Sequence, residues 1–322
     1  MALSPRPRLL ALRALGLGDL LTGVPALRAL RRSCPDHELV LAAPRVLGPL
    51  VELAGVADRR LDTSDLDGLT WVGEPPELAV NLHGKGPQSH HRLLALGPGR
   101  LVAFGCDAAG HPGPAWDPGE HETRRWCRLL AEALHITADP TDLALPTPST
   151  PAPAPGAVVV HPGAAYPSRR WPGDRFADVA RALADAGYDV VVTGGRDEVA
   201  LAALVGRRAG LPRRAVLAGQ TDLLRLCAQV ASARLVVCGD TGLSHVATAF
   251  GTPSVVLFGP TPPSRWGPPV DGPHVVVWHG HGVGDPWGDQ VDPALLSVGV
   301  DEVMDRALRA LRGPLSRPSP AR

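Results

Sequence analysis

The chain has 322 residues, of which 44% are hydrophobic and 20% charged, a composition typical of a globular protein of about two domains. Lys plus Arg and Asp plus Glu both number 32, so the net charge is zero and a general attraction to nucleic acid or to an anionic membrane is excluded. The five cysteines are scattered, odd in number and form no CxxC pair, which favours a reducing compartment and argues against a zinc site.

The first part of the chain alternates apolar runs with helical patterns. Three arginines interrupt the amino-terminal stretch, and no apolar run is long enough to cross a bilayer, so we expect neither a signal peptide nor a membrane span and predict a cytoplasmic protein. The apolar runs predict strands at residues 8–15, 37–43, 59–62, 77–82 and 99–104. The remaining patterns predict a loop at residues 16–19 and helices at residues 20–32, 46–54, 89–96 and 120–135.

A Pro-rich stretch follows and divides the chain. Residues 140–155 hold six prolines with Ser, Thr and Ala between them, which suits a semi-rigid linker and neither a helix nor a sheet. We therefore predict an amino-terminal domain over residues 1–139, a linker over 140–156, a second domain over 157–299, and a terminal helix with a frayed tail over 300–322.

The second half again alternates strands and helices. Strands are predicted at residues 157–161, 188–193, 215–217, 235–238, 254–258 and 275–278. Helices are predicted at residues 176–186, 198–209, 222–230, 241–250 and 300–311. Each half is therefore expected to form a mostly parallel sheet with helices on both faces.

The stretch from residue 235 to residue 268 is the most informative part of the sequence. A buried strand ends at Gly239, and Asp240 stands where an N-cap would begin the next helix. The backbone N–H groups of Thr241 and Gly242 would suit a phosphate at this helix N-terminus, and His245 shares their face one turn further on. An ordinary capped core helix with a buried histidine is the alternative for any one of these residues.

Two further loops of the second half follow strands and precede helices. In the segment 161–172, Arg169 and Arg170 offer fixed positive charge to a diphosphate, although a surface loop with solvated arginines is the alternative. In the segment 193–198, Gly194 permits close approach of a ligand and Glu198 could accept hydrogen bonds from ribose hydroxyls, or could stabilise the helix dipole.

The loop at residues 16–19 is the candidate of the first half. Two glycines, one of them Gly18, let the backbone approach a ligand, but the third glycine of the dinucleotide fingerprint is missing. Asp19 is either an N-cap or a general base that faces a second domain. The Asp65-Leu66-Asp67 triplet and the pair His279 and His281 are discounted as metal sites, so no metal ligand is assigned.

In combination these segments resemble glycosyltransferase family 9, the heptosyltransferase-like enzymes of bacterial cell-envelope assembly. The resemblance is carried in the second half by residues 240–245, 257–261 and 266–268 and by residues 161–163 and 169–172. In the first half it is carried by residues 18–19 and 25–30 and by the segment 81–84, which contains His83.

The resemblance implies an α/β GT-B fold, in which two Rossmann-like doubly wound domains face each other across a cleft. It implies inversion at the anomeric carbon with no cofactor and no required metal, and Asp19 as the base that deprotonates the acceptor hydroxyl. Gly18 and His83 would then lie on the acceptor side. Arg169 stands where the best-known heptosyltransferases carry a lysine, and its planar guanidinium contacts phosphate differently from the point charge of a lysine.

The donor-binding residues are carried over in the same way. The resemblance assigns the diphosphate to Arg169, Arg170, Asp240, Thr241, Gly242 and His245, and the nucleoside to Gly194 and Glu198. The expected partners are a nucleotide-diphosphate sugar, heptose-like and ADP-linked, and a glycan or lipid-linked acceptor, with peripheral membrane contact left open and no nucleic acid. A GT-B-shaped sugar-nucleotide epimerase and a catalytically silent nucleotide-sugar binding protein are the alternatives.

Overall fold

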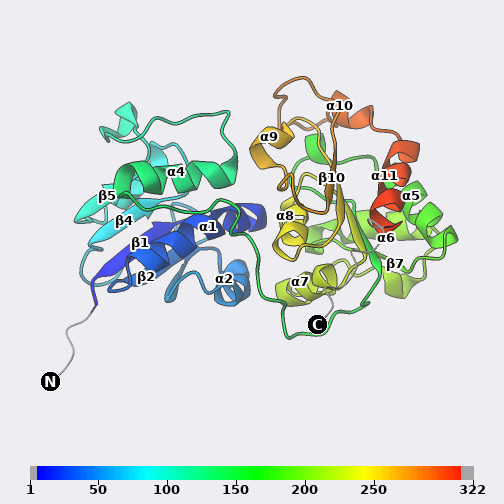
Figure 1. Ribbon diagram of the computed structural model, residues 1–322, viewed down its shortest axis with the longest axis horizontal. Coiled ribbons are helices and arrows are strands. Elements are labelled where there is room, and N and C mark those ends of the chain that lie inside the picture. Colours follow the sequence, from blue (N-terminus) through cyan, green and yellow to red (C-terminus); the bar gives the residue numbers. More distant parts are fainter. Residues whose placement is uncertain (1–5, 313–322) are drawn as a thin grey trace, which may run out of the picture. The chain divides into compact units, whose positions relative to one another are not determined.

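The structure is a computed structural model and describes residues 6–312. Two compact units make up the chain, Met1–Pro146 and Thr147–Arg322 (Figure 1). Their boundary falls inside the Pro-rich stretch that the sequence predicts as a linker. The carboxyl-terminal part of that stretch is tied to the second unit, because the buried Gln229 amide accepts from the Ala154 N–H at 2.7 Å and donates to the Ala154 carbonyl at 2.8 Å. The tail predicted at residues 313–322 lies outside the described residues.

The first unit is built on a parallel sheet with the strand order β3-β2-β1-β4-β5. Its strands are β1 Arg8–Leu12, β2 Glu38–Ala43, β3 Arg59–Asp62, β4 Leu78–Asn81 and β5 Arg100–Val102. Its helices are α1 Leu17–Ser33, α2 Gly48–Ala54, α3 Gln88–Leu94 and α4 Glu122–Leu134, with short 3-10 turns at Arg45–Leu47 and Asp107–Ala109.

Both faces of this sheet are covered, as the near-continuous apolar strands require. Leu10 and Leu12 of β1 pack in one core cluster with Leu93 of α3. Successive side chains of a strand point to opposite faces, so the alternate residues Leu9 and Ala11 face the other layer. Helices α1 and α4 pack against each other beside the sheet (Figure 1).

The second unit repeats this architecture with the strand order β10-β9-β8-β6-β7, again all parallel. Its strands are β6 Val158–His161, β7 Val190–Val192, β8 Leu235–Gly239, β9 Ser254–Leu257 and β10 His274–Val277. Its helices are α5 Gly173–Asp185, α6 Val199–Arg208, α7 Leu223–Ala231, α8 Gly242–Ala249, α9 Pro263–Trp266, α10 Pro293–Leu296 and α11 Val300–Arg312. Short 3-10 turns lie at Pro167–Arg169, Arg196–Glu198 and Arg213–Ala215.

The structure corrects several predicted boundaries. Residues 16–19 are not a loop, because α1 begins at Leu17 and Gly16 is its N-cap. Residues 215–217 do not form a strand: a 3-10 turn ends at Ala215, and only Val216 forms a bridge, to Val192. Thr241 has the extended backbone of an N-cap, with φ −150° and ψ 168°, so the N-cap of α8 is Thr241 and not Asp240, and the helix begins at Gly242 and not at Thr241.

Among residues 6–312 there is no helix with both the length and the apolar character that a membrane crossing needs.

Candidate functional site

Each sheet has one place where the strand order reverses direction, and the predicted site residues gather at these two places. In the first unit the chain moves outward from β1 through β2 to β3 and then returns to place β4 on the other side of β1. In the second unit the corresponding place lies between β6 and β8. Open parallel sheets bind ligands at the carboxyl ends of the strands that flank such a switch point.

Asp240 directly follows β8 at the switch point of the second unit. Its backbone N–H donates to the Leu257 carbonyl at 3.0 Å, which extends the sheet by one residue and holds the side chain at the carboxyl edge. The residue is only 5% exposed, and burial raises the pKa of its carboxyl to about 6, while the nearby Arg169 guanidinium acts in the opposite direction. Near neutral pH this carboxyl can therefore gain or lose a proton.

Arg169 comes from the loop after β6 and faces Asp240. Its Nη1 lies 4.0 Å from Asp240 Oδ2, and its guanidinium lies over the Tyr166 ring, 5.5 Å from the centroid. The Arg169 Nε is buried without a hydrogen-bond partner among the described residues. The guanidinium thus keeps donor capacity at the point where α8 begins.

The loop that carries Arg169 is braced on both sides. The Ser168 N–H donates to the Gly288 carbonyl at 3.2 Å, and the Asp292 N–H donates to the Ser168 carbonyl at 3.1 Å. Arg170 uses its Nε to donate to the Ala164 carbonyl within the same loop, at 2.7 Å. Arg170 therefore fixes the loop, and its predicted contact with a diphosphate remains a prediction.

The first turn of α8 has the features expected of an anion site. Thr241 is the N-cap, and its carbonyl accepts from both the backbone N–H and the Oγ of Ser244, at 3.0 and 2.7 Å. Gly242 is the first helical residue, so its N–H is one of those that an α-helix cannot bond internally. His245 is buried in the next turn, with its ring edge-on to Trp266 at 5.8 Å between centroids.

Glu198 lies at the ends of β6 and β7. Its Oε2 accepts from the Gly195 N–H at 2.7 Å, and the same oxygen lies 3.8 Å from His161 Nε2. Burial lowers the pKa of His161, and the Glu198 carboxylate and the neighbouring Thr193 oppose this effect. Gly194 is packed against the Glu198 side chain, since a Cβ there would lie 3.1 Å from Glu198 Cβ. Glu198 therefore caps the turn before α6, and a ribose contact at its partly exposed carboxylate remains a prediction.

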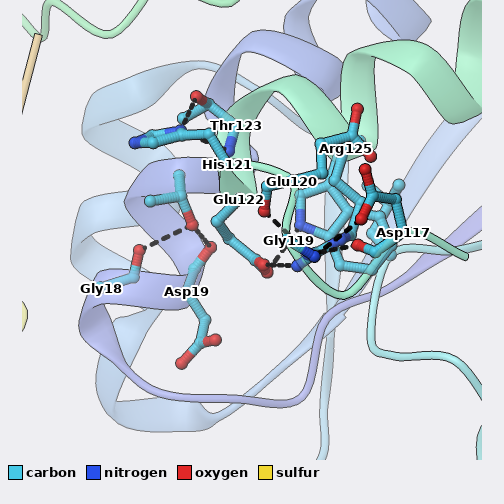
Figure 2. Close-up of polar contacts among 12 residues, drawn as sticks. Gly18, Asp19, Asp117, Gly119, Glu120, His121, Glu122, Thr123 and Arg125 are labelled. Carbon is cyan, nitrogen blue, oxygen red and sulfur yellow. Dashed lines mark hydrogen bonds and ion pairs between the residues drawn. The ribbon is translucent and has the colours of Figure 1, made fainter. Parts of the chain in front are cut away.

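Asp19 lies in the first turn of α1 at the switch point of the first unit. Its Oδ2 accepts from the Gly16 N–H at 3.1 Å, which satisfies a backbone donor at the start of the helix. Burial raises the pKa of the carboxyl, and Arg13 counteracts this. The Thr22 hydroxyl donates to the backbone carbonyls of Gly18 and Asp19. Figure 2 shows that the Asp19 carboxyl points away from these two carbonyls.

His83 follows β4 at the same switch point. Its Nδ1 is buried without a hydrogen-bond partner among the described residues, and burial together with the Arg13 charge lowers its pKa to about 4. The imidazole is thus neutral near pH 7, and its Nδ1 lies at the same edge of the sheet as Asp19.

Two buried charged residues at this edge were not predicted from the sequence. Arg13 is fully buried, and Glu122 on α4 is 5% exposed, yet the two form an ion pair at 3.1 Å. The available signals were a charged residue directly after the apolar run of β1, and a glutamate four residues before Trp126 on the buried face of an amphipathic helix.

No group of three or more His, Cys, Asp or Glu side chains within residues 6–312 is arranged to hold a metal ion.

Comparison with known proteins identifies the family. The sequence profile of the family described as glycosyltransferase family 9 (heptosyltransferase) matches residues 115–282, more than half of the chain. The chain belongs to glycosyltransferase family 9. The family resemblance predicted from the sequence is confirmed, and the matched part contains Glu122, Arg169 and Asp240 but not Asp19.

Relatives within family 9 align with the chain over part of their length. Lipopolysaccharide heptosyltransferase 2 of Escherichia coli (strain K12) is 40% identical over 108 residues, which are 32% of this chain and 30% of the relative. Lipopolysaccharide heptosyltransferase 1 of Pseudomonas aeruginosa (strain PAO1) is 33% identical over 159 residues, 48% of this chain and 43% of the relative. The chain thus spans less than half the length of these curated relatives.

Solved structures resemble the chain over nearly all of it. A glycosyltransferase of family 9 from Veillonella parvula DSM 2008 is 19% identical with a TM-score of 0.79, over 97% of this chain and 99% of that one. The E. coli ADP-heptose lipopolysaccharide heptosyltransferase II is 20% identical with a TM-score of 0.74, over 94% and 98%. At these identities the likeness establishes the fold, and the predicted α/β GT-B class with two Rossmann-like units is confirmed.

Proposed function

We propose that this protein transfers a heptose-like sugar from an ADP-linked donor to a hydroxyl group of a cell-envelope glycan. The observation that supports the proposal best is the pairing of Arg169 with the buried Asp240 at the start of α8, at the switch point of the second sheet. A fixed guanidinium and the free N–H groups of a helix N-terminus together suit a diphosphate. The names of the relatives supply the sugar, the nucleotide and the type of acceptor.

The proposed reaction is a single displacement that needs neither a metal nor a cofactor. The acceptor oxygen attacks the anomeric carbon while Asp19 takes the hydroxyl proton, and the bond from that carbon to the diphosphate oxygen breaks on the opposite face of the sugar. ADP leaves with the bonding electrons, and the residues around α8 stabilise its charge. The new glycosidic bond then has inverted configuration. We place the reaction in the cytoplasm, where a nucleotide sugar is available.

Donor recognition is tested first, by thermal unfolding of the protein with ADP, UDP, GDP, CDP and dTDP. A ligand that binds only the folded state at about one hundred times its Kd stabilises it by about 2.7 kcal/mol. We expect a clear rise of the unfolding temperature with ADP alone. A rise with another nucleoside diphosphate and none with ADP would refute the ADP-linked donor.

Transfer is tested with ADP-heptose and a lipopolysaccharide inner-core oligosaccharide, with and without EDTA. We expect a product of inverted anomeric configuration by NMR, at an unchanged rate in EDTA. Retained configuration would refute the single displacement, and loss of the rate in EDTA would refute metal independence.

Binding without transfer is a second candidate function, because the Asp19 carboxylate already has a structural use as the acceptor of the Gly16 N–H. The Asp19→Asn variant keeps an oxygen for this hydrogen bond but removes the base. Under our proposal this variant binds ADP as the wild type does and transfers no sugar. Transfer at the wild-type rate would show that Asp19 is not the base, and a wild-type protein that binds ADP without transfer would support a silent binding protein.

A further inference from the structure

Arg13 connects the two chain segments that flank the switch point of the first sheet. It follows β1 and is fully buried. Its Nε donates to the Asp19 carbonyl in the first turn of α1, and its Nη1 donates to the Leu82 carbonyl just after β4. Its Nη2 donates to Thr22 Oγ1 at 3.1 Å, one turn further along α1. One guanidinium therefore sets the position of the helix turn that carries Asp19 relative to the sheet.

The charge of this guanidinium is shared between two carboxylates. Arg13 Nη2 lies 3.1 Å from Glu122 Oε1 and 3.9 Å from Asp19 Oδ1. The Arg13 guanidinium also lies over the Trp126 ring, at 4.9 Å from its centroid. Glu122 is thus the nearer counter-ion, and Asp19 the more distant one.

Glu122 is itself held firmly at the start of α4. Its Oε1 accepts from Trp126 Nε1 at 2.8 Å, and its Oε2 accepts from Arg125 Nη1. Figure 2 shows the Glu122 side chain directed into the group of polar contacts that includes Arg125 and Asp117, whereas the Asp19 carboxyl points away from that group. These hydrogen bonds hold the Glu122 carboxylate in place.

We propose that Arg13 and Glu122 are a positioning pair for Asp19: Arg13 fixes its helix turn, and Glu122 draws the Arg13 charge away from its carboxylate. A lone buried cation at 3.9 Å would favour the ionised carboxylate and so weaken it as a proton acceptor. With Glu122 as the nearer partner, Asp19 keeps the proton affinity that a base needs. That this carboxylate takes the proton of an acceptor rests on the function proposed above.

The charged and titratable groups around Asp19 agree with this assignment. Burial raises the pKa of its carboxyl most, Arg13 lowers it and Glu122 raises it. His83, after β4, is neutral near pH 7 because its pKa is lowered to about 4. The balance between Arg13 and Glu122 is therefore the adjustable part of the electrostatics at this edge.

The test measures the titration of Asp19 directly, by ¹³C NMR of protein labelled at the Asp carboxyl carbons, with Asp19→Asn to assign the signal. In Glu122→Gln the counter-ion of Arg13 is neutral, so we expect the Asp19 titration midpoint to move to lower pH. Glu122→Asp, which restores the charge, is expected to move it back toward the wild-type value. The matched control is Thr22→Val, which removes another Arg13 partner of the same cluster but no charge, and its midpoint should equal that of the wild type.

An unchanged midpoint in a folded Glu122→Gln protein would overturn the proposal, and so would an equal shift in Thr22→Val. Loss of a buried carboxylate can prevent folding, so Arg13→Gln is the second variant. It removes the cation itself, and its midpoint is expected to move in the opposite direction, to higher pH. A shift of Arg13→Gln to lower pH, or no shift, would equally overturn the proposal.

The pH dependence of sugar transfer separates this inference from the proposed function. If Asp19 is the base, the acid limb of the rate profile moves with its titration midpoint in Glu122→Gln. If the midpoint moves and the acid limb does not, the positioning pair stands and the role of Asp19 as the base falls. If transfer depends on Asp19 but the midpoint does not respond to Glu122, the function stands and the pair falls.

Discussion

Gly163, in the loop after β6, leaves no room for a side chain because the Glu198 carboxylate occupies that space. A Cβ at residue 163 would lie 1.9 Å from Glu198 Oε1 and 2.2 Å from Glu198 Cδ, which is far closer than atoms can approach. The Gly163→Ala variant must therefore displace the Glu198 carboxylate. We expect the displaced carboxylate to give up the hydrogen bond from the Gly195 N–H and its position 3.8 Å from His161.

The expected cost follows from the bonds that are lost. A hydrogen bond to a charged acceptor contributes about 1.5–3 kcal/mol. Replacing Gly by Ala returns about 0.4–1 kcal/mol, because the unfolded chain loses freedom. The net loss of unfolding free energy is then about 0.5–2.6 kcal/mol. For a unit of this size the unfolding temperature should fall by roughly 1–10 °C.

Thermal unfolding of a double-mutant cycle measures this effect. In a Glu198→Ala background the obstacle is gone, so adding Gly163→Ala should cost nothing and should return the gain of about 0.4–1 kcal/mol. The control is Gly282→Ala, since a Cβ at residue 282 meets no atom within 4 Å. If Gly163→Ala costs the same with and without the Glu198 side chain, the carboxylate is not what excludes a larger residue, and the reasoning is wrong.

Three further outcomes follow from the second unit. Burial raises the pKa of Asp240 from 3.8 to about 6, so the folded protein holds the proton more tightly than the unfolded chain. As the pH rises from 4 to 7, the wild type should therefore lose up to about 3 kcal/mol of unfolding free energy relative to Asp240→Asn, measured by urea unfolding. Parallel pH curves of the two proteins would contradict this. Arg169→Ala should weaken ADP binding about tenfold to a hundredfold in calorimetric titration, and Arg169→Lys should weaken it less. Equal affinity of the wild type and both variants would show that Arg169 does not bind the diphosphate. Gln229→Leu leaves the Ala154 N–H unpaired and the Ala154 carbonyl with only the Ala157 N–H, at 3.3 Å, so it should speed amide hydrogen exchange at Ala154 and Gly156, measured by mass spectrometry. Unchanged exchange there would mean that the Gln229 side chain does not hold the linker.

Much of the fold was predictable because buried parallel strands are uninterrupted apolar runs that end at glycine or a polar residue. The run from Leu235 to Gly239 is β8, with the predicted start and a one-residue extension. The strand predicted at the equally apolar residues 215–217 was wrong, because this segment pairs with its neighbour only through the single bridge of Val216 with Val192. The number of backbone pairings, not length or composition, decides this, since β7 is also only three residues long but pairs with β6 at all three.

The candidate sites were predicted less completely. Asp240, directly after β8, and Arg169, in the loop after β6, were found because chain order alone brings such segments to the carboxyl edge. The loop predicted before α1 was wrong, because Asp19 is close enough to Gly16 to close the first helical turn. The pair of Arg13 and Glu122 could not be predicted, since local patterns do not reveal which helix covers a buried charge.

The contacts of Arg13 also bear on how the first unit assembles during synthesis. Its partners Thr22, Leu82 and Glu122 lie 9, 69 and 109 residues further along the chain. A chain that emerges amino-terminus first can form β1 and α1 early, but the guanidinium then lacks its counter-ion until α4 has been made. The edge that carries Asp19 is therefore one of the last parts of the unit to become stable, and its completion coincides with the docking of the helix that precedes the linker.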